Sequence, residues 1–173
     1  AAKELNTKVE MNYSWLYGSS FSASSELQTM AAGWYQNGTE VIFACGGPMF
    51  DSISAAASAE DAKVIGVDVD QSSQSPTVIT SAMKGIGEAA QQALKAAETE
   101  DSWKAFNGDG TQTIVLGAAE GAVGLPVATW SLSWPVSEYE AMFADIVAGK
   151  LTIDDADVPE PASTAHVTMN IVK

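Results

Sequence analysis

The stretch Val64-Ile65-Gly66-Val67-Asp68-Val69-Asp70-Gln71 is an apolar run without helical periodicity that ends on acidic residues. Short continuous apolar runs are typical of strands that are buried in a parallel sheet. In open α/β sheets, ligands bind just beyond the carboxyl ends of such strands. The stretch therefore predicts a buried strand that carries Asp68 and Asp70 to the edge of a ligand site.

Composition excludes several classes of protein. The chain has 173 residues, 46% of them hydrophobic, and a formal net charge of −14. Such an acidic chain lacks the Lys and Arg that bind nucleic acid or an anionic membrane surface, so we expect neither as a partner. The single Cys45 cannot form an internal disulfide, and its apolar surroundings predict a small buried residue.

The remaining elements alternate between strand and helix. Helix periodicity follows Leu27 after a capping-box pattern at Ser25 and Gln28, and a second helical face runs from Ile86 to Ala97. Further strands are expected at 9–16, 40–45, 78–83, 113–116 and 166–172, further helices at 49–59 and behind a second capping box at Ser137 and Glu140, and an acidic linker at 154–161. Strands and helices in this order, joined by short turns, predict an α/β fold with a parallel sheet.

A small group of residues at predicted strand ends and loops could bind a ligand. The Asp68 carboxylate could accept hydrogen bonds from two neighbouring hydroxyls, as in a ribose, and Lys84 could donate to a sugar hydroxyl. Gly46 and Gly47 would allow close approach of the backbone, and the loop residue Phe21 could stack on a planar ring. The alternatives are a solvated strand end, a tight turn and an aromatic tucked under the sheet.

The sequence contains few of the residues that enzyme active sites commonly use. With one histidine, His166, and one cysteine, transition-metal sites and Cys/His or Ser/His/Asp catalysis lack their usual residues. Gly85-Ile86-Gly87-Glu88-Ala89-Ala90 matches a dinucleotide fingerprint only superficially, because Lys84 precedes it where an apolar turn is expected. We expect no enzyme activity, no cofactor and no metal.

Four motifs in order resemble one family. They are Val41-Ile42-Phe43-Ala44-Cys45-Gly46-Gly47, the stretch 64–71, Ile79-Thr80-Ser81-Ala82-Met83-Lys84, and Gly121-Ala122-Val123-Gly124-Leu125. Together they resemble the basic membrane protein (BMP) family, nucleoside-binding lipoproteins of bacterial ABC importers. The resemblance implies a type I periplasmic-binding-protein fold, in which each lobe is a parallel-sheet three-layer sandwich and a hinge closes two lobes on the ligand.

The resemblance also implies a division of the chain between lobes. Residues 1–77 and 98–173 would form the second, carboxy-terminal lobe, and the strand and helix at 78–97 would complete the first lobe. That amino-terminal lobe would lie upstream, together with a lipid-bearing anchor that holds the protein at the cell surface or in the periplasm. We therefore expect an extracytoplasmic, membrane-associated protein that is represented here by one lobe.

Carried over by position, the family implies that Phe21 stacks on a purine and that Gly47 gives close backbone contact with the ligand. Asp68 would accept from the ribose hydroxyls and Lys84 would donate to the sugar. The family's Gly-Gly-Thr-Gly is replaced here by Gly46-Gly47-Pro48-Met49, and its acidic residue after the loop aromatic by Ser22-Ala23. Both departures lie on the side that would recognise the base.

The function expected from the sequence is capture of a purine nucleoside, or a related ribosylated compound, for delivery to an ABC permease. An effector-binding domain of a sugar- or purine-responsive transcription regulator would have the same fold, and a nucleoside-processing α/β enzyme is a further alternative. An upstream lipid-attachment cysteine would favour the importer, an upstream helix-turn-helix the regulator, and release of free base the enzyme.

Overall fold

The computed structural model describes residues 5–110, 113–127, 134–153 and 164–172. The chain divides into two compact units, one formed by Ala1–Ser22 with Ile153–Lys173 and the other by Ala23–Thr152. Strands pair mainly in parallel and helices connect them, so the mixed α/β fold class predicted from the sequence is confirmed. This class agrees with the periplasmic-binding-protein-like lobe that the resemblance implies.

The larger unit contains a four-stranded sheet in the order β2-β3-β4-β5. Strands β2 (Val41–Phe43), β3 (Lys63–Asp68) and β4 (Val78–Lys84) are parallel, and the short β5 (Val123–Gly124) pairs antiparallel to the end of β4. Helix α2 (Met49–Ala59) connects β2 to β3. The predicted strand at 64–71 is therefore the centre of a parallel β2-β3-β4 ladder.

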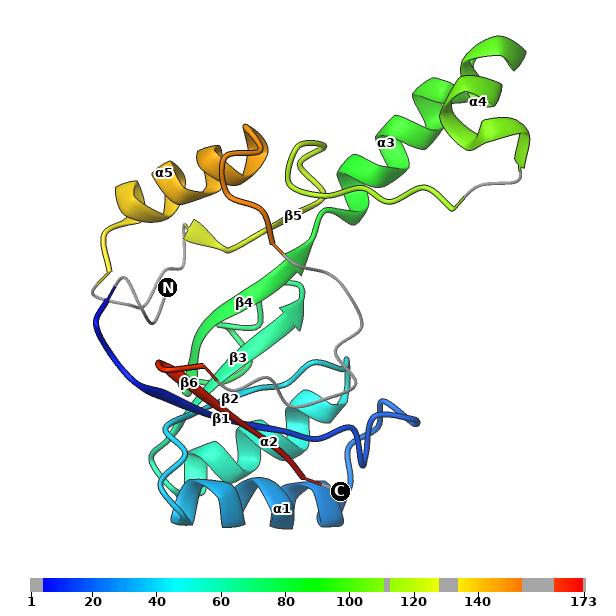
Figure 1. The fold of residues 1–173 in the computed structure, drawn as a ribbon. Helices are drawn as coiled ribbons and strands as arrows, with labels where there is room; N and C mark the ends of the chain where they lie inside the picture. The colour runs from blue at the N-terminus through cyan, green and yellow to red at the C-terminus, as the bar shows by residue number, and fades with distance from the viewer. Residues whose placement is uncertain (1–4, 111–112, 128–133, 154–163, 173) are drawn as a thin grey trace. The chain divides into compact units, whose positions relative to one another are not determined.

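One face of this sheet is buried under α1 (Ser25–Gln36) and α2, which lie side by side (Figure 1). The α1 face that packs inward consists of Leu27, Ala31 and Tyr35, close to the periodicity predicted from the sequence. The Tyr35 hydroxyl donates to the Lys63 carbonyl at 2.9 Å, and burial raises the pKa of Tyr35 to about 12. The other buried apolar side chains of this layer include Ile42, Ala44, Phe50, Ile53 and Val64.

The cap of α1 differs from the prediction by one residue. The N-cap is Ser24, whose side chain accepts from the Leu27 amide at 3.1 Å, and not Ser25. Ser24 is selected by a tertiary contact, because its amide donates to the Ser52 hydroxyl on α2 at 2.8 Å and its carbonyl accepts from the same hydroxyl at 2.9 Å. Similarly, α5 (Val136–Val147) has Pro135 as its N-cap, and the predicted capping box at Ser137 and Glu140 does not form the cap.

Two further segments differ from their predictions. Residues 113–116 do not form a strand, and Val115 is 84% exposed, so this apolar run lies outside the sheet. The strand that pairs with the end of β4 is instead β5, within a Gly-rich segment. Helix α4 (Glu100–Asn107) was not predicted; it begins at a capping box in which Thr99 and Ser102 exchange hydrogen bonds. The linker predicted at 154–161 lies outside the described residues.

The smaller unit holds a separate two-stranded sheet. Strand β1 (Val9–Tyr13) pairs in parallel with β6 (Val167–Ile171) and lies in a different sheet from β2 and β3, whereas the sequence predicted one parallel sheet. Asn170 on β6 links the two strands through its side chain. Its amide nitrogen donates to the Glu10 side chain at 2.8 Å and to the Asn12 side chain at 3.1 Å, both on β1. These cross-strand partners are about 160 residues apart, so sequence periodicity could not reveal the pairing.

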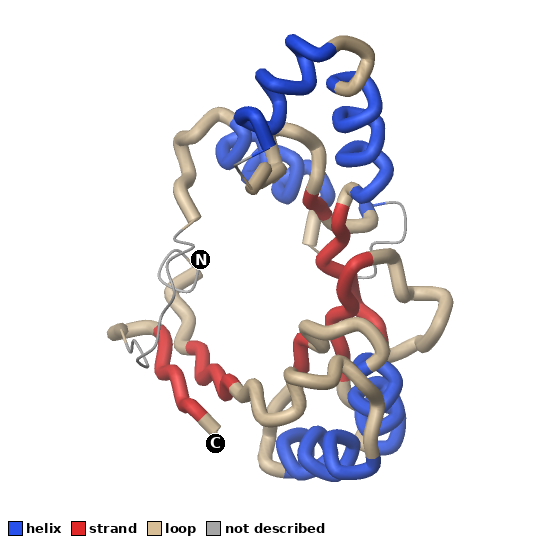
Figure 2. The backbone as a smooth tube through the Cα atoms, turned by 90° about the vertical axis from the view of Figure 1, so that its right-hand side faces the viewer, coloured by secondary structure: helices blue, strands red, loops and turns tan. Residues whose placement is uncertain are grey.

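Helix α3 (Ile86–Ala96) has the predicted extent but not a covered apolar face. It follows β4 directly and contacts α4 in a helical hairpin (Figure 2). None of its residues is buried, and Ile86 and Leu94 are 64% and 72% exposed. An apolar helix face in this state is available to another protein surface.

We predict that Leu27→Ala lowers the free energy of unfolding by roughly 2–5 kcal/mol, because it leaves a cavity under α1. The matched control is Leu94→Ala on α3, which removes an exposed side chain and should change that free energy by no more than about 0.5 kcal/mol. Urea denaturation followed by circular dichroism measures both. A comparable loss in the two variants would contradict the packing described for α1 and α3.

Candidate functional site

The parallel ladder brings the carboxyl ends of β3 and β4 together. Asp68 is the last residue of β3 and Lys84 the last of β4. Their side chains form an ion pair, with Lys84 Nζ 2.7 Å from Asp68 Oδ1. Two candidate residues that are 16 positions apart in the sequence therefore meet at the sheet edge where α/β proteins bind ligands.

The ion pair is held at the surface and remains accessible. Asp68 Oδ1 is out of solvent contact, whereas the side chains of Lys84 and Asp68 are 65% and 36% exposed. The hydrogen bond and the charge of Asp68 raise the pKa of Lys84, and Cys45 is near enough to add to this electrostatically. The pair thus presents a cationic donor and a carboxylate acceptor next to each other.

Asp68 has an unusual backbone conformation for a residue at the end of a strand. Its φ is +68°, in the left-handed region, and the Val69 amide donates to the Val67 carbonyl at 2.8 Å. These two features describe a γ-turn centred on Asp68, a strained conformation for a residue other than glycine. The chain therefore bends sharply where the carboxylate is presented.

Gly46 and Gly47 follow β2 at the same edge of the sheet. Gly47 has φ +40° and leads into α2 through hydrogen bonds such as Phe50 N to Gly47 O at 3.1 Å. A side chain at Gly47 would meet no atom within 4 Å, so the glycine serves the turn and leaves open space beside it. The geometry agrees with the turn predicted here, and it leaves room for a ligand to approach the backbone closely.

Cys45, in contrast, is exposed, and the prediction of a buried thiol is wrong. Ile42 and Ala44 point into the core, so the alternation of a strand turns Phe43 and Cys45 outward. The apolar composition of residues 41–45 suggested burial on both faces, whereas α1 and α2 cover only the face that carries Ile42 and Ala44.

Phe21 belongs to the other unit of the chain. It is 56% exposed and has φ +51°, which is rare for an aromatic residue. It lies between Ser20 and Ser22, whose side-chain hydroxyl donates to the Ser20 carbonyl at 3.0 Å. The exposed loop aromatic expected from the sequence is therefore present.

Sequence reasoning missed three residues beside Asp68. Gln71 and Ser81 are buried polar residues that hydrogen-bond around the end of β3, and Gly66 lies against both. The sequence did hold a signal for Gln71 and Ser81, because each is a polar residue within an otherwise apolar motif. A polar residue that is buried in such a position needs a hydrogen-bond partner.

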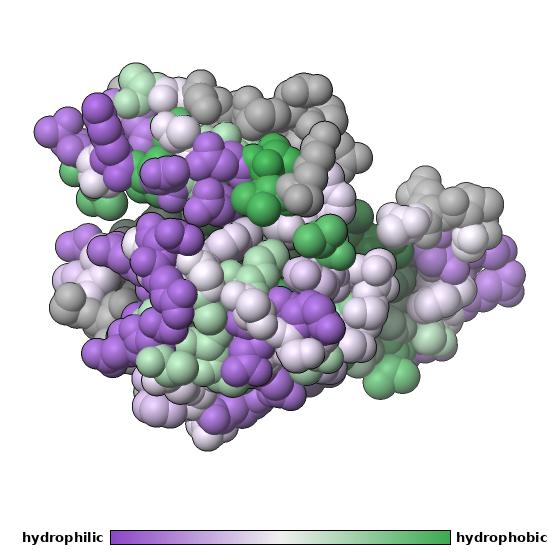
Figure 3. Space-filling view, turned by 90° about the horizontal axis from the view of Figure 1, so that it is seen from below, coloured by the Kyte–Doolittle hydropathy of each residue, from purple (hydrophilic) through white to green (hydrophobic). Residues whose placement is uncertain are grey.

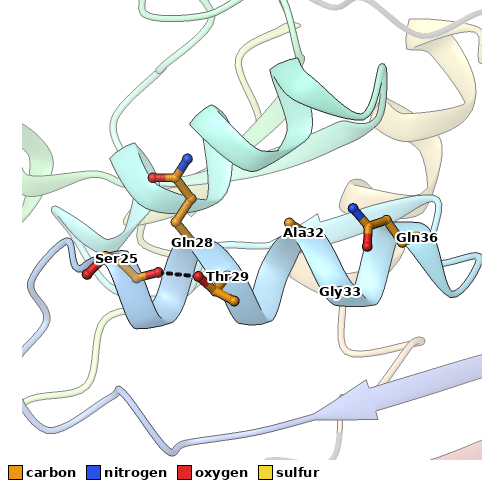
Figure 4. A pocket seen from close by; sticks show the side chains of 6 residues that line it. All are labelled: Ser25, Gln28, Thr29, Ala32, Gly33 and Gln36. Atoms are coloured by element: carbon orange, nitrogen blue, oxygen red, sulfur yellow. Dashed lines mark hydrogen bonds between the residues drawn. The ribbon is translucent and has the colours of Figure 1, made fainter.

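Other features do not compete with this edge as a site. A shallow groove lies along α1 and is lined by that helix alone (Figure 4); its residues are Ser25, Gln28, Thr29, Ala32, Gly33 and Gln36. The side on which α1 lies carries mainly hydrophilic and near-neutral residues (Figure 3). Within the described ranges, no group of three or more His, Cys, Asp or Glu side chains could hold a metal ion.

The first glycine of the superficial dinucleotide fingerprint, Gly85, has a packing role, whereas a Cβ at Gly87 would meet no atom within 4 Å. A Cβ at Gly85 would lie 2.5 Å from the Gly121 carbonyl oxygen, and the Gly85 amide donates to the Ala122 carbonyl at 2.7 Å. Gly85 thus permits close approach of the segment that leads into β5.

Comparison with protein families identifies a model that covers most of the chain. The family model described as ABC transporter substrate-binding protein PnrA-like (Bmp) matches residues 2–156. No curated protein sequence matches the chain. In the part of the chain that the structure describes, no helix has the length and apolar character to span a bilayer.

We predict that Asp68→Asn lowers the pKa of Lys84 towards that of an ordinary lysine, because the partner charge is lost. Because the pKa of Lys84 is raised in the folded chain, the ion pair stabilises the folded state at pH values below the ordinary lysine pKa. This stabilisation is lost as the pH rises through the raised pKa of Lys84. Titration of the Lys84 13Cε resonance measures the change.

The control variant is Asp145→Asn, which breaks the 3.0 Å Asp145–Lys150 ion pair elsewhere. It should leave the Lys84 titration unchanged. An unaltered Lys84 pKa in Asp68→Asn would show that the pair does not form in solution.

Proposed function

The chain belongs to the Bmp family of PnrA-like ABC transporter substrate-binding proteins, and from this premise we propose that it binds a ribosylated small molecule, with purine nucleosides as the first candidates. The family is one of extracytoplasmic solute-binding proteins and not of enzymes. Its role is to capture a ligand without chemistry and to present it to an ABC permease.

The observation that carries the proposal is the Asp68–Lys84 pair. Lys84 Nζ lies 2.7 Å from Asp68 Oδ1, and its ammonium group has further hydrogens that can be donated to ligand oxygens. Asp68 Oδ2 has no hydrogen-bond partner among the described residues and can accept from a hydroxyl. A vicinal diol supplies the complementary set, since each hydroxyl can both donate and accept.

The other candidates contribute shape and stacking in this proposal. Gly46 and Gly47 let the backbone approach the ligand, which the open space at Gly47 supports. Phe21, which lies in the other unit of the chain, is the candidate for stacking on a base, and its exposure leaves a ring face for such a contact. Because Pro48, Met49, Ser22 and Ala23 depart from the family pattern on the base side, a ligand panel must also include ribosides with other bases.

We further propose that the ligand is enclosed by two lobes, of which this chain supplies the carboxy-terminal one through residues 1–77 and 98–173. Within the segment 78–97, α3 would pack on the other lobe, whereas β4 pairs with β3 in the sheet of this one. The exposed apolar side chains of α3, Ile86 and Leu94, support this assignment because they offer a surface for packing. The accessibility of the Asp68–Lys84 pair agrees with a site that requires a second wall.

We predict millimolar binding of inosine to this chain alone and much tighter binding to the two-lobed protein, because one lobe cannot enclose a small ligand. Binding should weaken about 10- to 100-fold for 2′,3′-dideoxyinosine, since a hydrogen bond to a charged group contributes roughly 1.5–3 kcal/mol. Chemical-shift titration of the chain and calorimetry of the two-lobed protein measure these affinities.

Asp68→Ala should reproduce the loss seen with the dideoxy ligand, whereas Asp145→Ala should bind as the unmodified chain does. Equal affinity for inosine and its dideoxy analogue would remove the diol from the proposal. Full-strength binding by the single lobe would refute the two-lobed account, and release of free hypoxanthine would identify an enzyme.

A further inference from the structure

We propose that Gln71 is a positioning residue, which together with Ser81 clamps the strained turn at Asp68 and so holds the carboxylate against Lys84. The proposal rests on the function proposed above, in which Asp68 is the ligand acceptor. It concerns residues that touch neither Lys84 nor a ligand and act through the backbone of β3.

The turn at Asp68 requires an external support. With φ +68° and a hydrogen bond from Val69 N to Val67 O, Asp68 occupies a conformation that non-glycine residues adopt only when their surroundings impose it. The ion pair to Lys84 is too exposed to impose it, because surface ion pairs stabilise weakly. Buried contacts must therefore hold the turn.

The Val67 amide shows where this support acts. In a parallel ladder, alternate residues of a strand direct their backbone groups to the same neighbour. The Ile65 carbonyl accepts from Ala44 at 3.0 Å, so Val67 faces the same edge, beyond the last paired residue of β2, Phe43. The Gln71 side chain supplies the missing partner, as its Oε1 accepts from the Val67 amide at 2.8 Å.

Ser81 ties the same glutamine to the neighbouring strand. The Gln71 amide donates to Ser81 Oγ at 3.1 Å, and Gln71 and Ser81 are 7% and 0% exposed. Gln71 is thus bonded through its side chain to β3 and through its backbone to β4, three residues before Lys84. Both members of the ion pair are fixed to one buried network.

Gly66 provides the space for the clamp. A Cβ at this position would lie 2.6 Å from Gln71 Oε1 and 2.7 Å from Ser81 Oγ, so any larger residue would displace one of them. The glycine within the strand is therefore explained by the clamp and not by backbone freedom.

Gln71→Met tests the proposal, because it keeps the length of the side chain and removes the acceptor oxygen. We expect the Lys84 pKa to fall towards the ordinary lysine value and inosine to bind at least tenfold more weakly to the two-lobed protein, at temperatures where circular dichroism reports a folded chain. Gln74→Met, an exposed glutamine in the same loop, is the matched control and should change neither.

Two independent variants test the same clamp: Ser81→Ala removes one of its hydrogen bonds, and Gly66→Ala displaces its side chains. If Gln71→Met does not fold, these two variants test the proposal in its place. A lower melting temperature with an unchanged Lys84 pKa and unchanged affinity would mean that Gln71 is merely structural, and would overturn the proposal. If the unmodified protein binds no nucleoside, the proposed function fails, and the Lys84 titration alone then decides whether the clamp exists.

Discussion

The parallel pairing of β3 with β2 and β4 is the constraint on which the candidate site depends. Parallel strands end at a common edge, so three separate segments present Gly46 and Gly47, Asp68 and Lys84 there. The pairing also buries one face under α1 and α2, which fixes the register through residues such as Val64. Without that burial, Asp68 and Lys84 would have no reason to meet.

At this edge of the sheet, the buried hydrogen bonds of Gln71 and Ser81 and the exposed Asp68–Lys84 ion pair differ in what they contribute. The Asp68–Lys84 pair contributes little stability, since both side chains are partly exposed, and in the proposed function it offers complementary groups to a ligand. The hydrogen bonds of Gln71 and Ser81 are buried, and breaking them would leave unsatisfied groups in the core. Rigid support beneath an accessible pair suits a protein that captures a ligand and releases it unchanged.

Much of the larger unit could be predicted from local pattern. The extents of α2, α3 and β4, the turn at Gly46 and Gly47, and the α/β class follow from periodicity and turn residues that act over short distances. Local pattern misled where a tertiary contact decided: Ser52 selected Ser24 as the cap, and one-sided covering of the sheet exposed Cys45. The pairing of β1 with β6 joins the two ends of the chain, which no local signal encodes.

The sequence by itself determined that the chain is acidic, α/β and built on a buried strand ending in Asp68, because composition and periodicity are properties of neighbouring residues. It also carried the motifs of the family to which the chain belongs. Only the tertiary structure decided that Asp68 pairs with Lys84. It also decided that the backbone of Asp68 adopts φ +68°, next to the buried hydrogen bond between Gln71 and Ser81. Those features depend on which strands lie beside each other and on which backbone groups are left unpaired when a strand ends.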